Sequence, residues 1–120
     1  MNNNLIHYFF HREYILYKGK GYVKKYYTKG ILMFEGEYLN GERNGNGKEY
    51  NEDGTIKFEG DYLNGERHGK GKEFYHNTEL RFEGEYLNGK RNGKGKEYDY
   101  DGCLIFKGEY LNGKRIEKTQ

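Results

Sequence analysis

The chain has 120 residues, 33% of them hydrophobic, and a formal net charge of +2 from 21 Lys and Arg against 19 Asp and Glu. It contains 14 Tyr, 7 Phe and 19 Gly, but no Ala, Ser, Pro or Trp. This composition excludes a large aliphatic core, a serine nucleophile and a disulfide framework within the chain, since Cys103 is the only cysteine.

The sequence repeats with a period of 24 residues. Glycines recur at this interval, as do aromatic residues two positions before and two positions after them. In the first unit Arg12 and Val23 replace two of the repeated glycines. Such departures from the pattern are common in the terminal unit that caps a repeat array. We expect one repeat domain over residues 1–120, with units at 10–33, 34–57, 58–81, 82–105 and a partial unit at 106–115.

Each unit is predicted to form a β-hairpin. Apolar and charged positions alternate in residues 56–62, as in a strand with one buried face, and residues 80–86 repeat the alternation. Residues 64–69 contain Asn-Gly and a second glycine, which predict a reversal, and a second strand is expected at 70–75. Asp-Gly at 53–54 predicts the next turn. The expected fold class is all-β: an elongated, single-layer antiparallel meander of β-hairpin repeats with about ten short strands.

The repeated glycines and aromatic residues predict the core. Gly60 lies between Phe58 and Tyr62 on the expected apolar face, so we expect a neighbouring ring to lie over its bare backbone. The aromatic residues at these positions in all units are predicted to form one stripe: Phe34, Tyr38, Phe58, Tyr62, Phe82, Tyr86, Phe106 and Tyr110.

One placement stays open at this stage. Strict alternation puts Phe74 on the same face as Lys72, and the same holds for Tyr50 and Tyr98 in their units. Either the lysine stem lies along the aromatic face, or a β-bulge at Gly71 resets the register.

The segment 58–71, Phe-Glu-Gly-Asp-Tyr-Leu-Asn-Gly-Glu-Arg-His-Gly-Lys-Gly, resembles the MORN (membrane occupation and recognition nexus) repeat. The resemblance covers about residues 10–115 and is closer to the 24-residue variant of the repeat than to the shorter common form. Tyr62 stands where the common form often has Trp. The resemblance implies a twisted antiparallel rod without catalytic activity, used as a scaffold, a self-associating module or a targeting domain.

Two surfaces are candidates for binding a protein partner or a second copy of the chain. A single-layer sheet leaves its rings half covered, so the eight aromatic residues of the stripe form the candidate partner-binding face. The last strand, which ends near Tyr110 and Leu111, leaves an unpaired edge that suits strand addition. We therefore expect a non-catalytic scaffold that acts through the aromatic face or this edge.

Positive charge is concentrated at the N-terminal end. Residues 1–33 contain six basic residues and one acidic residue, whereas residues 34–120 carry a net charge of −3. The simplest interpretation is a solvated cap. The alternative function is a peripheral membrane-targeting module, with nucleic acid as a less favoured anionic partner. The candidate anionic-lipid patch is Lys18, Lys20, Lys24, Lys25 and Lys29.

The repeat also explains the residues that resemble catalytic or metal-binding motifs. His68 stands where other units have Asn44 and Asn92, which indicates a role in a turn. Asp99-x-Asp101-Gly resembles the start of a calcium loop but lacks the later ligands. We expect no catalytic residue, metal, cofactor or small-molecule substrate. No apolar run reaches the roughly 18 residues of a membrane span, so we expect a cytoplasmic protein, at most peripheral to a membrane.

Overall fold

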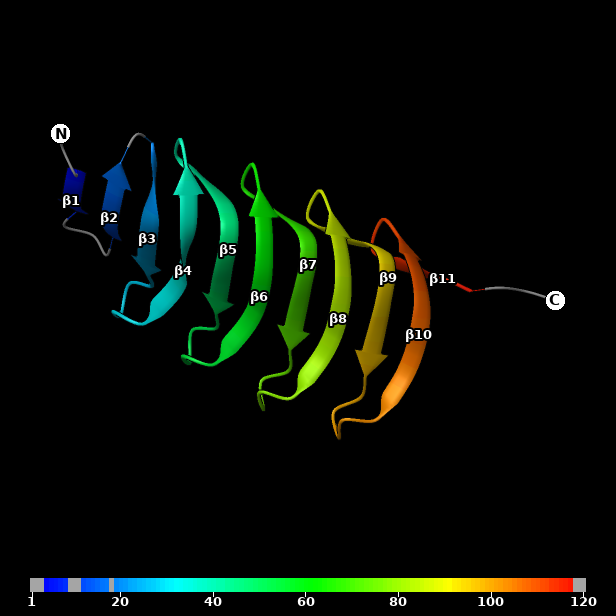
Figure 1. Ribbon diagram of the computed structural model, residues 1–120. Helices are drawn as coiled ribbons and strands as arrows, with labels where there is room; N and C mark the ends of the chain where they lie inside the picture. Colours follow the sequence, from blue (N-terminus) through cyan, green and yellow to red (C-terminus); the bar gives the residue numbers. More distant parts are fainter. Residues whose placement is uncertain (1–3, 9–11, 18, 118–120) are drawn as a thin grey trace.

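The computed structural model describes residues 4–8, 12–17 and 19–117. They form one antiparallel sheet in which each strand pairs with its neighbours in sequence. The eleven strands are β1 (Asn4–Tyr8), β2 (Arg12–Tyr17), β3 (Lys20–Tyr26), β4 (Leu32–Leu39), β5 (Glu42–Tyr50), β6 (Ile56–Leu63), β7 (Glu66–Phe74), β8 (Leu80–Leu87), β9 (Lys90–Tyr98), β10 (Leu104–Leu111) and β11 (Lys114–Ile116). Figure 1 shows a single layer of bowed strands. The structure measures 61 × 28 × 16 Å along its principal axes. The predicted single-layer meander is confirmed, with eleven strands instead of about ten.

Tight turns close the hairpins. Between β6 and β7, Asn64 and Gly65 have φ angles of 51° and 88°, as a type I′ turn requires. The prediction of a reversal over 64–69 is therefore wrong in extent, because β7 begins at Glu66. Gly69, with a φ of 78°, lies inside β7, near the register shift between β6 and β7.

The predicted Asp53-Gly54 turn is confirmed. The Gly54 N–H donates to the Asn51 carbonyl at 2.9 Å, and the Asn51 N–H donates to the Thr55 carbonyl at 2.8 Å. Gly54 has a φ of 90°, which explains why glycine occupies the position. Turns of this kind join each unit to the next at the edge opposite the type I′ turns.

A row of paired glycines crosses the sheet at right angles to the strands. Gly60 pairs with Gly47 on one side and with Gly71 on the other. A Cβ atom on Gly60 would lie 2.6 Å from the Gly71 Cα and 2.9 Å from the Phe58 Cζ, so only glycine fits. The ring predicted to cover this glycine is therefore that of Phe58. The full row is Gly36, Gly47, Gly60, Gly71, Gly84, Gly95 and Gly108.

The aromatic residues pack beside this row and form the core. Phe58 is fully buried and makes edge-on contacts with Tyr62 and Tyr86, at centroid distances of 5.8 and 5.2 Å. The Tyr86 contact joins one unit to the next. Phe34 and Phe82 make equivalent contacts in their units, so the core is a continuous stripe of rings.

Lys72 and Phe74 share a face, but it is the face opposite the aromatic core. The Phe58 ring lies against Gly71, which fixes Gly71 and Glu73 on the aromatic side and their neighbours on the other. Neither alternative left open by the sequence is therefore right. Register shifts occur on both sides of Gly71, yet the alternation of residues 71–74 stays intact.

Candidate interaction groove

The structure places the eight residues of the predicted aromatic binding face in the core. Seven of them are buried, and Phe106 packs partly buried against the others. Arginines cover the rings: the Arg67 Cζ lies 4.0 Å from the Phe58 centroid, and the Arg91 Cζ lies 4.1 Å from the Phe82 centroid. The sequence-based expectation of half-covered rings did not foresee this arginine layer. The aromatic residues therefore stabilise the fold and do not form an open surface.

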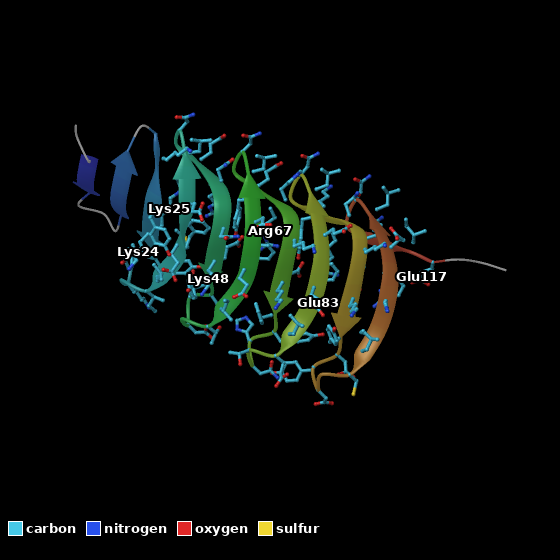
Figure 2. All side chains as sticks on the ribbon, viewed as in Figure 1. Lys24, Lys25, Lys48, Arg67, Glu83 and Glu117 are labelled. Atoms are coloured by element: carbon cyan, nitrogen blue, oxygen red, sulfur yellow. The ribbon has the colours of Figure 1, made fainter. Side chains whose placement is uncertain are left out.

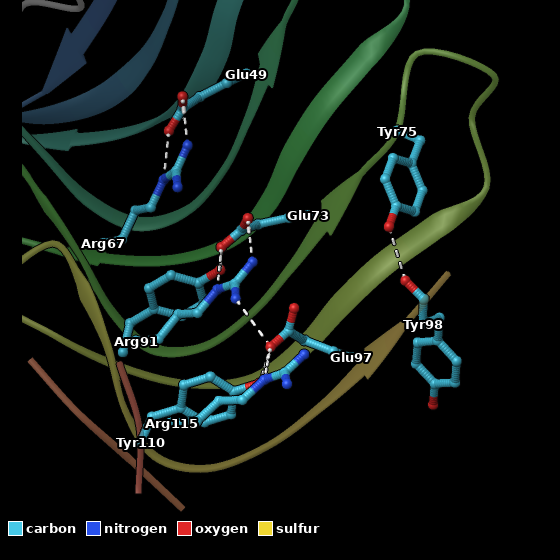
Figure 3. Close-up of polar contacts among 10 residues, drawn as sticks. Glu49, Arg67, Glu73, Tyr75, Arg91, Glu97, Tyr98, Tyr110 and Arg115 are labelled. Carbon is cyan, nitrogen blue, oxygen red and sulfur yellow. Dashed lines mark hydrogen bonds and ion pairs between the residues drawn. The ribbon is translucent and has the colours of Figure 1, made fainter. Parts of the chain in front are cut away.

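Three arginines of this layer, Arg67, Arg91 and Arg115, are each held by a carboxylate of the preceding unit. The Arg91 Nε and Nη2 donate to both oxygens of Glu73, at 3.0 and 2.9 Å, and the Tyr86 hydroxyl donates to the same carboxylate (Figure 3). Burial opposes ionisation of Glu73, but these hydrogen bonds outweigh it and lower the pKa of the carboxyl. Burial and the Glu73 charge raise the pKa of Tyr86. These hydrogen bonds therefore have a structural role, because they join one unit to the next.

The same junction recurs along the rod. Glu49 accepts hydrogen bonds from Arg67 and Tyr62. Glu97 accepts them from Arg115 and Tyr110, and burial together with Glu97 raises the pKa of Tyr110 to about 12. The hydrogen bonds of these three carboxylates therefore join neighbouring units of the same chain, and they hold the arginines over the aromatic rings.

The opposite face of the sheet contains a groove of about 1030 Å³ that crosses β3 to β10. The glycine row forms its floor, and charged side chains on either side of the row form its walls. The lining residues are Tyr22, Glu35, Gly36, Glu37, Asn46, Gly47, Lys48, Glu59, Gly60, Lys70, Gly71, Lys72, Glu83, Gly84, Glu85, Lys94, Gly95, Lys96, Lys107, Gly108 and Glu109.

One wall of the groove alternates in charge from strand to strand. Lys48 pairs in register with Glu35 on β4 and with Glu59 on β6. Opposite charges on neighbouring strands stabilise a sheet, each pair by a small amount. The alternation ends at β10, where Lys107 pairs in register with Lys96. The full ladder is Lys24, Glu35, Lys48, Glu59, Lys72, Glu83, Lys96 and Lys107.

Tyrosine hydroxyls support some of the ladder carboxylates. Glu35 accepts hydrogen bonds from Tyr50 at 2.5 Å and from Tyr22 at 3.0 Å, and the Tyr50 bond is the main reason why the pKa of Glu35 is lowered. Glu83 accepts a hydrogen bond from Tyr98 at 2.7 Å. These contacts place Tyr50 and Tyr98, whose face the sequence left open, beside the groove.

The five lysines of the predicted lipid patch do not gather on one face. Lys24 and Lys25 are neighbours in β3 (Figure 2). Successive side chains of a strand point to opposite faces of the sheet. Lys24 belongs to the charge ladder, whereas the Lys25 Nζ lies 5.4 Å from the Tyr38 centroid on the aromatic side. Lys20 begins β3, Lys29 lies in the turn after it, and Lys18 is outside the described residues.

β10, the predicted last strand, is followed by the short strand β11, so the prediction of a wholly unpaired edge is wrong. β11 pairs with Glu109, Tyr110 and Leu111, so within the described residues 104–108 have no neighbouring strand on this side. Leu104 and Ile105 are about half exposed, at 52% and 51%. This edge is the second surface on which another chain could bind.

Two further expectations from the sequence concern the residues that resemble catalytic or metal-binding motifs and membrane-spanning segments. His68, expected in a turn, lies in β7. Over the described ranges, no group of three His, Cys, Asp or Glu residues could hold a metal ion. In the same ranges there is also no helix of the length and apolarity needed to cross a membrane.

Comparison with known proteins gives one result. The family model of the MORN repeat matches residues 34–56, 58–78 and 82–104, which together exceed half of the chain. Each matched segment begins at a core phenylalanine and includes the hairpin that follows it. No curated protein matches the chain.

Proposed function

The chain belongs to the MORN repeat family, and we propose that it is a protein-binding repeat module whose working surface is the groove. MORN repeats generally mediate interactions with proteins or membranes, and the family is a non-catalytic repeat type. The observation that carries the proposal is the contrast between the two faces. The aromatic face is closed by its arginine layer, whereas the groove presents charged side chains around a glycine floor over eight strands.

The charges of the groove favour a protein over an anionic membrane. Six glutamates and six lysines line it, so its formal charge is balanced. An anionic lipid surface is recognised by clustered basic residues, and it would meet as many carboxylates as ammonium groups here. A protein segment with charges of both signs matches such a lining.

The test is affinity capture from a cell lysate, followed by quantitative mass spectrometry. The variant Lys70→Glu/Lys72→Glu reverses two charges in the groove, and Lys90→Glu/Lys114→Glu reverses two exposed lysines outside it. We expect a specific partner that binds the wild type and the control variant but not the groove variant. Circular dichroism checks that both variants are folded. Equal capture by both variants would show that the groove is not the binding surface.

The membrane alternative has its own readout. If the N-terminal lysines target the protein to a membrane, vesicles with phosphoinositide will float the protein, and added salt will release it. The matched variant is Lys20→Glu/Lys29→Glu, at two lysines of the predicted patch that are exposed in the described part of the chain. Flotation lost in this variant and retained in the groove variant would favour the membrane function.

The C-terminal edge supports a second candidate function, self-association. The part of β10 without a neighbour among the described residues, 104–108, includes the exposed Leu104 and Ile105 and is typical of an edge that accepts another strand. In the two preceding units, charged residues, Arg81 and Lys57, stand at the position of Ile105. We expect a mass by light scattering that rises with concentration, and a monomeric mass for Ile105→Lys. A wild type that stays monomeric at high concentration would exclude this route.

A further inference from the structure

The groove is not uniform along its length, and we propose that it binds a partner segment in one orientation. An acidic part of the segment lies over β9 and β10, and a basic part lies over β4 to β6. This inference deepens the function proposed above and rests on it.

Two departures from the repeat create the polarity. Lys107 stands where the other units have Glu35, Glu59 and Glu83, so β10 gains a positive charge and loses a negative one. Asn46 stands where Lys70 and its counterpart on β9 occur, so β5 lacks a positive charge. Both changes act in the same direction, because they make the N-terminal part of the groove more acidic and the C-terminal part more basic.

The lining residues show the resulting division. Three glutamates and one lysine come from β4 to β6, a formal charge of −2. Five lysines and three glutamates come from β7 to β10, a formal charge of +2. Beside the lining at the N-terminal end, Asp61, which accepts a hydrogen bond from Asn46, adds one negative charge and Lys24 of the ladder adds one positive charge. The total is balanced, but the two halves carry opposite charge.

The two ends are far enough apart to act separately. Six strand spacings of about 4.8 Å separate β4 from β10, roughly 29 Å in all. The Debye length at 0.1 M salt is about 10 Å, so each end interacts mainly with the part of a ligand directly above it. An extended segment of about nine residues covers this distance. A partner can therefore distinguish the two ends.

The pairing of Lys96 with Lys107 indicates where an acidic group binds. Like charges in register on neighbouring strands repel each other, and every other neighbouring pair of the ladder combines a lysine with a glutamate. Lys94 also lines the groove at this end. A carboxylate between these three lysines would restore the alternation. The geometry therefore points to an acidic side chain of the partner at this position.

The test uses the glycine floor as a set of NMR reporters. The probe is the capped peptide Glu-Glu-Glu-Gly-Ser-Gly-Lys-Lys-Lys, prepared with a nitroxide at either its acidic or its basic end and added to ¹⁵N-labelled protein. We expect the acidic-end label to broaden the amide signals of Gly95 and Gly108. The basic-end label should broaden those of Gly36 and Gly47.

The alternative outcomes separate this inference from the proposed function. If both labels broaden both ends equally, the groove binds the peptide without a fixed orientation, and only the present inference fails. If no groove glycine responds to the peptide, charge order does not suffice for binding and the inference also fails. In that case the capture experiment with the groove variants still decides whether the groove is the binding surface.

A double variant removes most of the charge difference between the two halves of the groove, leaving formal charges of −1 and 0 in place of −2 and +2. Asn46→Lys/Lys107→Glu gives both positions the residue type of the other units. We expect about threefold to tenfold weaker peptide binding and a much weaker orientation preference, with a melting temperature equal to or above that of the wild type. Lys114→Glu, which reverses a charge near the same end but outside the groove, should change the affinity less than about twofold. An unchanged orientation in the double variant would overturn the inference.

Discussion

Gly60 shows how one small residue determines the arrangement of the core. Its missing side chain lets the Phe58 ring lie across the backbone of two strands, and a Cβ would approach the Lys70 carbonyl oxygen to 2.5 Å. The obstacle is backbone, which cannot rotate away. At Gly108 a Cβ would meet only the ring of Phe106, at 2.9 Å, and this ring is only partly buried.

Gly60→Val should therefore be much more destabilising than Gly108→Val. We expect the first change to lower the free energy of unfolding by about 3 kcal/mol or more, because strand separation and ring packing are both disturbed. The second should cost about 1 kcal/mol, since the Phe106 ring can shift toward solvent. Urea denaturation followed by circular dichroism measures both. Equal stability of the two variants would contradict the proposed packing of rings on glycine.

The Glu73 carboxylate should make the stability of the protein depend on pH. Its pKa is lowered in the folded state because the hydrogen bonds from Arg91 and Tyr86 outweigh the effect of burial. A lowered pKa stabilises the fold above the ordinary value of 4.5, and this stabilisation is lost as the pH falls through the folded-state value. Glu73→Gln should therefore lose about 1.5–3 kcal/mol at pH 7 and much less at pH 3.

Chemical denaturation at the two pH values tests this prediction. The control is Glu66→Gln, an exposed residue of the same strand, which should unfold like the wild type at both pH values. A Glu73→Gln variant that is equally destabilised at pH 3 and pH 7 would show that the charge of Glu73 does not contribute.

At the level of the strands, two units differ by a single hydroxyl group at the edge of the groove. Tyr98 donates a hydrogen bond to Glu83, but Phe74, at the same position of the preceding unit, has no hydroxyl to offer Glu59. Phe74→Tyr should therefore stabilise the hairpin by about 0.5–1 kcal/mol, and Tyr98→Phe should destabilise it by a similar amount. Thermal unfolding measures both variants. Changes of the same sign in the two would contradict the role of the hydroxyl.

The strands could be predicted more fully than the turns that join them. Strict alternation predicted residues 56–62 as a strand because period-2 patterns survive without tertiary information, and β6 covers Ile56–Leu63. The start of β7 was missed because Gly69 has a positive φ inside a strand, and such a glycine resembles a turn residue in the sequence. The register shift there depends on the partner strand, which no local pattern reveals.

The binding surface was harder to predict than the fold for a related reason. The sequence contains the aromatic stripe, but the arginine layer over it depends on residues such as Arg67 and Glu49, which are 18 positions apart and meet only across paired strands. The groove has the same origin, since its floor exists only when glycines of seven strands align. The signal available in the sequence was the alternation of acidic and basic residues on the polar side of the strands.

At the scale of the whole molecule, the strands of each described unit pack against those of its neighbours. The core contacts of Phe58 reach Tyr62 in its own unit and Tyr86 in the next, and Arg91 joins Glu73 in the same way. Stability in such an array is approximately a sum over units and their junctions. A unit can then be removed without loss of the fold, provided that the register of the remaining strands is kept.

Deletion of residues 58–81 tests this property and the proposed unit boundaries. The deletion joins Lys57 to Phe82, so the new strand keeps the alternation of β8. We expect a folded protein about 10 Å shorter, because two strands are lost, and a urea m value about one fifth smaller. Deletion of residues 58–69 is the control. It removes half a unit, mismatches the remaining strands and should abolish cooperative unfolding. Small-angle scattering and urea denaturation distinguish the outcomes: an unfolded 58–81 deletion would mean that stability depends on contacts beyond neighbouring units.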